Sequence, residues 1–396
     1  MTLDKSKAYW LVGFALLWLM VGANLPSPLY AVYMRLWHFS PAMLTLIFAS
    51  YALVLIPTLL LLGHLSDQVG RRPILLGGLM MAAAASSVFA LAQGVTWLFI
   101  ARVMQGIAVG VMSGAATAAL VELHPREDHR HAALVASIAT AGGTALGPVF
   151  SGLLAQYGPA PLAFPYWIQA AFLLLVLLGV WMMPETVAKT SGTLSWCPSI
   201  GVPKPIRKPF VIVAMTAFVA WAVAALYMAL VPAYVMKLLH ISNLAVAGSV
   251  VFAMLGVSSV AQSALRRVPP RLGMISGLAL LVVGLGGVVL AVPTQSLELI
   301  ALGTLVTGVG QGLAFGGSMA LINQMAPPEQ RGRVVSSFYV VIYLGVGLPV
   351  IGTGLAATQI GLYRAVSGFA LVIALVGAVI AYVTARSGSL LPKQVC

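Results

Sequence analysis

The sequence predicts an all-α integral membrane protein with twelve transmembrane helices in two six-helix bundles, and three observations support this fold class. Hydrophobic residues make up 61% of the 396 residues and charged residues only 7%, a composition that would expose large apolar patches in water. Apolar stretches of about 20 residues, long enough to cross a bilayer as helices, recur along the chain. Segments of about ten residues with alternating polarity, typical of a membrane barrel, do not occur.

Twelve stretches fit a membrane-spanning helix. Their approximate limits are 10–32, 42–63, 74–93, 97–120, 132–157, 164–183, 209–236, 243–265, 272–292, 296–322, 334–359 and 363–385. The first stretch is too long for a signal-peptide core and has no clear cleavage site after it, so we expect it to be retained as a helix.

The predicted first helix carries two prolines, Pro26 and Pro28, between Asn24 and Tyr30. Because proline has no backbone N–H group, this pair should break or kink the helix. The carbonyl groups released by the break could then line a cavity. Asn24 and Tyr30 are therefore candidate cavity residues.

The loop between the second and third helices concentrates charge, because Asp67, Arg71 and Arg72 lie within six residues. Gly63 should let helices approach closely, and Gly70 can supply a backbone conformation that a tight turn needs. Near the end of the second helix, the Asp67 carboxylate would face an unfavourable helix dipole, so it should pair with a cation such as Arg71 or Arg72. The alternative is that the two arginines only anchor the topology.

Arg102 is predicted to lie inside the fourth helix. Burying a guanidinium group there costs at least a few kcal/mol unless it faces the bundle interior or water. Arg102 is therefore a functional candidate, together with the neighbouring Gln105. The alternative is that the Arg102 side chain extends to the outer interface.

The predicted fifth helix contains Gly143, Gly147, Pro148 and Gly152. Small residues one turn apart permit close helix contact, and proline permits a bend. Ordinary membrane-helix packing is the alternative explanation for this pattern.

A proline-rich linker, 184–208, separates an N-terminal bundle, 1–183, from a C-terminal bundle, 209–396. The two halves resemble each other weakly, a feature typical of transporters that rock one bundle against the other around a midplane site. The matching segments are 122–130 with 323–331, Gln105-Gly106 with Gln311-Gly312, and Gly147 and Gly152 with Gly347 and Gly352. The second-half counterpart of the charged loop, 265–273, has arginines but no acid.

The net charge of +13 follows the predicted topology. Most Lys and Arg residues fall on one side of the membrane, which predicts a multi-pass protein of the inner (cytoplasmic) membrane with both termini in the cytoplasm. No basic run interleaved with aromatic residues indicates nucleic-acid binding. Cys197 and Cys396 fall on the same predicted side, and we expect two free thiols rather than a disulfide.

These motifs resemble those of the major facilitator superfamily, and within it the twelve-helix drug:proton antiporter branch. The resemblance rests on the charged loop, on Arg102-x-x-Gln105-Gly106 and on the G-P pattern of the fifth helix. It implies that Asp67 contacts the opposite bundle and latches one conformation, that Arg102 handles a coupling ion or substrate, and that the fifth helix belongs to an exporter. The candidate cavity residues are Asn24, Tyr30, Tyr51, Gln105, Trp221, Tyr227, Gln262, Gln311, Tyr339 and Tyr343.

None of the eight Asp and Glu residues falls near the middle of a predicted helix. A buried carboxylate relay is therefore unsupported, and proton coupling would use rim groups such as Asp67 or Glu122, or the charge of the cargo against Arg102. A cavity with a cation and no anion should favour neutral or anionic amphiphiles over cationic dyes.

We therefore expect a secondary-active exporter of small amphipathic compounds, with a transporter of a specific metabolite such as a sugar or organic acid as the alternative. An intramembrane enzyme would need a nucleophile, metal ligands or paired carboxylates at depth, and no such cluster occurs. No phosphate-binding loop supports direct ATP drive. We expect no cofactor and no metal, a monomer, and as partners a small-molecule substrate, protons and membrane lipids.

Overall fold

The computed structural model describes residues 3–62, 65–125, 128–187, 200–238, 240 and 242–387. All regular secondary structure in these ranges is helical. Twelve of the described helices are long and apolar enough to cross a membrane. The predicted all-α membrane fold class is therefore confirmed.

The chain divides into two compact units. Unit 1 comprises residues 1–37, 50–198 and 243–249, and unit 2 comprises 38–49, 199–242 and 250–396. Two helices, α3 (Pro41–Leu62) and α11 (Leu244–Ala264), therefore begin in one unit and end in the other. The boundary near residue 198 lies within the predicted linker. The predicted division did not include the grouping of residues 38–49 with unit 2 or of residues 243–249 with unit 1.

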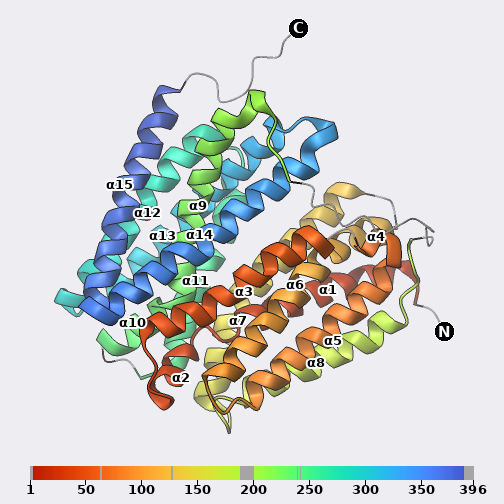
Figure 1. Cartoon of the computed structure of the whole chain (residues 1–396), viewed down its shortest axis with the longest axis horizontal. Helices are drawn as coiled ribbons and strands as arrows, with labels where there is room; N and C mark the ends of the chain where they lie inside the picture. Colours follow the sequence, from red (N-terminus) through yellow and green to blue (C-terminus); the bar gives the residue numbers. More distant parts are fainter. Residues whose placement is uncertain are drawn as a thin grey trace. The chain divides into compact units, whose positions relative to one another are not determined.

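Unit 1 is a bundle in which α1, α5, α6, α7 and α8 pack side by side (Figure 1). Its helices are α1 (Lys5–Asn24), α2 (Tyr30–Leu36), α4 (Leu65–Val69), α5 (Arg71–Ala90), α6 (Val95–Leu123), α7 (His129–Tyr157) and α8 (Phe164–Trp181). Leucine, alanine and valine dominate its buried positions.

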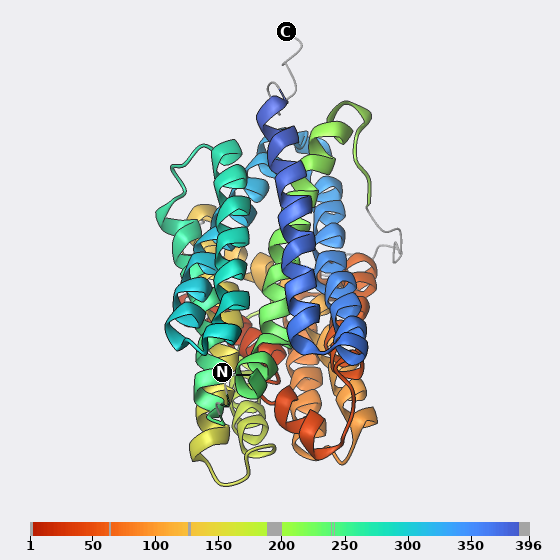
Figure 2. The ribbon, with the colours of Figure 1, turned by 90° about the vertical axis from the view of Figure 1, so that its left-hand side faces the viewer.

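Unit 2 is a second bundle, and Figure 2 shows its green-to-blue helices side by side. Its helices are η1 (Lys204–Ile206), α9 (Arg207–Ala229), α10 (Val231–Leu238), α12 (Pro270–Thr294), α13 (Leu297–Met325), η2 (Pro328–Gln330), α14 (Arg331–Ile360) and α15 (Leu362–Arg386). The closest pairing is between α12 and α13, where Gly277 and Gly310 bring the two backbones together.

Two predicted helices are interrupted. The stretch 10–32 is divided into α1 and α2 by five non-helical residues that contain Pro26 and Pro28, so the predicted break is present. The stretch 209–236 was predicted as one helix, and this prediction is wrong. It is divided at Leu230, just before Pro232, into α9 and α10.

The two units repeat the same helix contacts. Gly106 of α6 packs on Tyr51 of α3, and both Gly308 and the predicted counterpart Gly312 of α13 pack in the same way on α11, at Met254 and Ser258. The register of the predicted repeat therefore stays a prediction. On α14, Gly345 contacts α9 as Gly143 contacts α1, whereas the Cβ position of Gly347 lies near Ala49.

Candidate functional site

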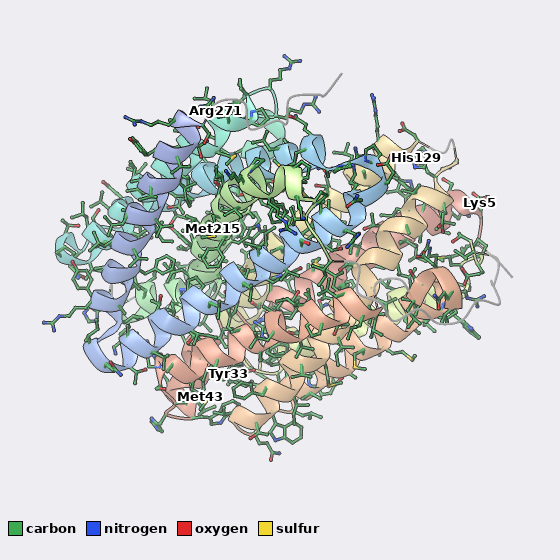
Figure 3. All side chains as sticks on the ribbon, turned by 45° about the horizontal axis from the view of Figure 1, so that its top comes forward. Lys5, Tyr33, Met43, His129, Met215 and Arg271 are labelled. Carbon is green, nitrogen blue, oxygen red and sulfur yellow. The ribbon has the colours of Figure 1, made fainter. Side chains whose placement is uncertain are left out.

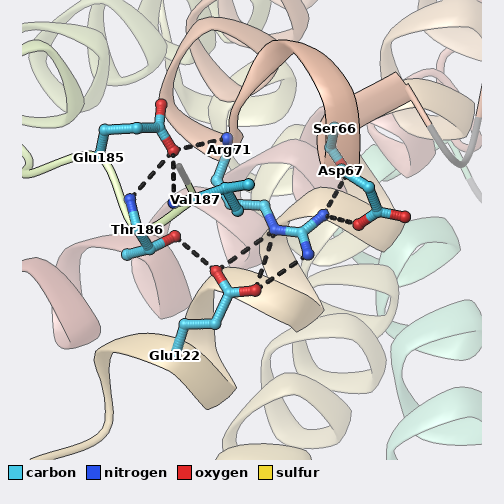
Figure 4. A network of polar contacts seen from close by, with 7 residues as sticks. All are labelled: Ser66, Asp67, Arg71, Glu122, Glu185, Thr186 and Val187. Carbon is cyan, nitrogen blue, oxygen red and sulfur yellow. Dashed lines mark hydrogen bonds and ion pairs between the residues drawn. The ribbon is translucent and has the colours of Figure 1, made fainter. Parts of the chain in front are cut away.

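A charged network lies at the end of unit 1 where α4 and α5 meet (Figure 4). The buried Arg71 guanidinium donates to Asp67 Oδ1 at 2.5 Å, to Ser66 Oγ at 2.6 Å and to Glu122 Oε1 at 2.9 Å. Arg71 therefore joins α4, α5 and the end of α6. Because guanidinium nitrogens form a rigid planar fork, one arginine can hold two carboxylates in fixed positions.

A second carboxylate caps the start of α5. Glu185, just beyond α8, accepts from the backbone N–H groups of Arg71 at 2.8 Å and Arg72 at 3.1 Å. Gly70 makes this possible, because its φ is +109° and a Cβ there would collide with the Glu185 carboxylate. Thr186 Oγ1 donates to Glu122 at 2.5 Å and closes the network.

Three sequence expectations for the charged loop have different outcomes. Gly63 lies outside the described residues. Asp67 is the third of the five residues of α4, and residues 63–64 between α3 and α4 lie outside the described residues, so its place near the end of the second helix stays a prediction. Arg71 pairs with Asp67, whereas among the described residues Arg72 joins the network through its backbone N–H group.

The second group surrounds Arg102 in the interior of unit 1. Arg102 is 2% exposed, which does not fit the alternative that it extends to the interface. Its Nε donates to Tyr30 Oη at 2.5 Å, and its Nη1 donates to Ala23 O at 2.7 Å and to Gln105 Oε1 at 3.0 Å. The guanidinium carbon also lies 5.3 Å from the Tyr30 ring and 5.5 Å from the Tyr51 ring.

The Arg102 group satisfies carbonyl oxygens that the break after α1 leaves unbonded. The helical partner of Gly22 O would be the N–H of residue 26, but Pro26 has none. Gln105 Nε2 donates to Gly22 O at 2.9 Å and replaces that bond. Arg102 bonds the next carbonyl, Ala23 O, and places a cation at the C-terminal end of α1.

Asn24 does not join this group, because its amide donates to Met20 O at 2.9 Å within α1. Beside it, α7 packs on α1 through the predicted glycines. A Cβ at Gly143 would collide with Leu17 O, and one at Gly147 with Val21 O. On the same helix, a Cβ at Gly152 would collide with the Leu244 O of α11.

Unit 2 holds the remaining candidates in separate contacts. Ser258 links Gln262 and Gln311, Trp221 packs edge-on against Phe315, and Tyr339 lies beside Tyr343. Tyr227 donates to Thr304 and Thr307 on α13. The Trp221 indole nitrogen is buried without a hydrogen-bond partner among the described residues. These contacts do not join the unit 2 candidates into one group, so their role in a cavity stays a prediction.

Sequence reasoning missed Glu185, Thr186 and the pairing of Glu122 with Arg71. The sequence did hold a signal for Glu122 and Glu185. Each lies just beyond the end of a predicted helix, on the same predicted side of the membrane as the charged loop.

Figure 3 shows Lys5 and His129, at the starts of α1 and α7, at one end of unit 1, with Tyr33 at the other end. Across the described residues, no group of three or more His, Cys, Asp or Glu side chains could hold a metal ion.

The chain is similar to several curated membrane transport proteins over part of its length. It is 28% identical over 193 residues to the inner membrane transport protein YajR of Escherichia coli (strain K12), covering 47% of this chain and 40% of that protein. It is 31% identical over 139 residues to the class E tetracycline resistance protein of Escherichia coli, covering 35% of this chain and 33% of that protein. The aligned segments thus span less than half of these relatives.

Solved structures match over nearly the whole chain. A bacterial homolog of the human lysosomal transporter Spinster, in an inward-facing and unoccupied conformation, has a TM-score of 0.80 at 15% identity, covering 96% of this chain and 97% of that one. The human organic anion transporter MFSD10 has a TM-score of 0.68 at 18% identity, covering 96% and 100%. At these identities the likeness shows the fold alone.

The family model described as Major Facilitator Superfamily matches residues 12–350 and 265–393. Together with the fold, this match excludes the enzyme alternative. The predicted family is confirmed, and the chain belongs to the Major Facilitator Superfamily of membrane transporters.

Proposed function

We propose that this transporter is a secondary-active exporter of small amphipathic compounds that works by alternating access. The observation that carries the proposal is the close packing of α7 on either side of Pro148. Gly143 and Gly147 bring its backbone against α1, and Gly152 brings it against the start of α11. A helix that packs closely on two neighbours and contains a proline can bend while it keeps both contacts.

The location of the acids supports a neutral or anionic cargo. In the described membrane-spanning helices, Asp and Glu occur only near the ends, and Glu122 and Glu298 are each the second residue from an end. A cationic cargo would therefore meet no carboxylate in the middle of a described membrane-spanning helix. One relative, the class E tetracycline resistance protein, supports export of an amphipathic compound.

Proton coupling is part of the proposal through Asp67 and Glu122, the rim carboxylates that Arg71 holds. Protonating either carboxylate would weaken its hydrogen bond with Arg71 and loosen the junction between α4, α5 and α6. The driving ion would then act at one end of unit 1 rather than at mid-membrane.

The test uses the full chain reconstituted in liposomes with an imposed pH gradient. We expect efflux of neutral and anionic amphiphiles that rises with the gradient and that chemically diverse amphiphiles inhibit. Weak or absent transport of cationic dyes is expected. Inhibition by only one class of metabolite would instead support the specific-metabolite alternative, and transport that ignores the gradient would contradict proton coupling.

A further inference from the structure

Unit 2 contains a cavity of about 110 Å³ between the end of α11, the start of α12 and the second half of α13. Glycines form much of its wall, among them Gly273, Gly312 and Gly316, and the side chains of Gln262 and Arg266 reach it. At roughly 30 Å³ per water molecule, it has room for a group the size of a phosphate.

The same place in unit 1 is filled by the chain itself. The glycine contacts match α3 with α11 and α6 with α13. In unit 1, the helix α4 lies against α5 and α6 at this position and presents Asp67 to Arg71. Between α11 and α12 the connection is shorter and forms no helix. The cavity is therefore the space that α4 and its acid occupy in unit 1.

The cavity is basic and has no acid of its own. Arg266, which reaches the cavity, and its neighbour Arg267 are exposed, and neither makes an ion pair or hydrogen bond with any described residue. The nearby Arg271, labelled in Figure 3, donates to Thr384 O and Ala385 O. None of the residues that line the cavity is Asp or Glu. A guanidinium group without a carboxylate beside a phosphate-sized space is complementary to an anion.

Apolar side chains flank the same opening. Leu265, which lines the cavity, is 37% exposed, and Leu272 on the first turn of α12 is 55% exposed. Exposed leucines beside a basic opening are suited to contact the acyl chains of a lipid. The basic side of the membrane is predicted to be cytoplasmic, and that leaflet carries the anionic lipids.

We propose that this cavity binds the phosphate group of an anionic phospholipid, with Arg266 as its charged ligand and the glycine wall as its floor. The lipid takes the place that the carboxylate of α4 takes in unit 1. Unit 1 thus neutralises Arg71 with its own carboxylates, and unit 2 uses the membrane to neutralise Arg266. The proposal is independent of the transported compound.

The test is native mass spectrometry of the purified full chain with dioleoyl-phosphatidylglycerol or dioleoyl-phosphatidylcholine. We expect the wild type to retain phosphatidylglycerol preferentially. Arg266→Gln should weaken that retention about fivefold, the effect of one basic residue near an anionic surface. Gly316→Leu should also weaken it, because a Cβ there meets only Gln262 and the longer side chain fills the cavity.

Two matched variants serve as controls. Arg364→Gln removes an exposed cation from the first turn of α15, and Gly286→Leu adds the same side chain where nothing lies within 4 Å of the Cβ. Both should bind phosphatidylglycerol as the wild type does. Unchanged retention in Arg266→Gln and Gly316→Leu would overturn the proposal. Arg266-dependent binding of inorganic phosphate without phosphatidylglycerol retention would also overturn it, because the site would then serve a soluble anion.

Discussion

At the scale of single residues, Gln105 replaces the backbone hydrogen bond that Pro26 removes from α1. Gln105→Leu should therefore lower the free energy of unfolding by about 1–3 kcal/mol, because Gly22 O would be buried without a donor. In a Pro26→Ala background the loss should be smaller, since position 26 would again offer an N–H group. Thermal unfolding in detergent of the wild type, the two single variants and the double variant measures this coupling.

The control for this cycle is Gln262→Leu, because the Gln262 amide donates to the Ser258 side chain rather than to a carbonyl of a broken helix. Its effect should be the same with and without Pro26. Equal losses for Gln105→Leu in both backgrounds would show that Gln105 does not act through the break.

Arg71 and Arg72 offer a second comparison between single residues. Arg71→Lys should cost on the order of 1–2 kcal/mol of stability and most of the transport, because a lysine cannot hold Asp67, Ser66 and Glu122 together. Arg72→Lys should be nearly neutral, since only the Arg72 backbone joins the network. Unfolding and liposome transport are measured for both, and equal effects would contradict the bridging role of Arg71.

The sequence allowed part of this network to be predicted. Asp67 and Arg71 are four residues apart, so their pairing follows from local spacing. Glu122 and Glu185 lie 51 and 114 residues from Arg71 along the chain. Their approach depends on how α5, α6 and α8 pack, which no local pattern specifies. The predicted depth of Arg102 in the fourth helix was sufficient to identify it as a candidate. Its partners on α1 were not predicted, because they too depend on how the helices pack.

At the scale of elements, the glycines of α7 control its contact with α1. Gly147→Leu should abolish transport and lower stability by about 1–3 kcal/mol, because the new side chain meets Val21 O and Asn24. Gly142→Leu on the same helix is the control, since nothing lies within 4 Å of its Cβ. Transport and thermal unfolding of the two variants test the contact, and equal behaviour would refute it.

The start of α7 gives a pH-dependent prediction. Asp128 accepts from the backbone N–H groups of His131 and Arg130, and these hydrogen bonds, that from His131 above all, lower its pKa below the usual 3.8. A carboxyl group whose pKa is lower in the folded than in the unfolded protein stabilises the fold at pH values above its ordinary pKa. This contribution disappears as the pH falls through the lowered pKa.

Asp128→Asn keeps a side-chain acceptor for the same N–H groups but cannot titrate. The melting temperatures of wild type and Asp128→Asn should therefore differ more at neutral pH than at a pH below the carboxyl range. A difference that stayed constant with pH would show that the cap does not depend on the charge of Asp128.

Helix interruptions show what local patterns can and cannot predict. Two prolines close together at Pro26 and Pro28 were sufficient to predict the break after α1. A single proline, Pro232, did not stand out within a long apolar stretch, although its missing N–H group marks the junction of α9 and α10.

At the scale of the whole molecule, hydropathy was sufficient to predict the fold class, because a bilayer forces every span to satisfy its own backbone hydrogen bonds. The grouping of 38–49 with unit 2 and of 243–249 with unit 1 was beyond such reasoning. Thr358 Oγ1 on α14 accepts from the N–H of Ala42, and Gln156 on α7 accepts from the N–H of Leu244. Such long-range contacts depend on tertiary packing rather than on composition.

The two halves also differ in charge, and this difference leads to the last prediction. Asp67 joins α4 to α5 in unit 1, whereas the corresponding connection in unit 2 has arginines and no acid. A single change, Asp67→Asn, should therefore shift the balance between the conformations of the transporter. Hydrogen–deuterium exchange should rise in residues 65–72 and change at distant helix ends, while Arg267→Gln, which removes an exposed arginine, should leave exchange as in the wild type. If Asp67→Asn changed neither exchange nor transport, the charged loop would serve only to anchor the topology.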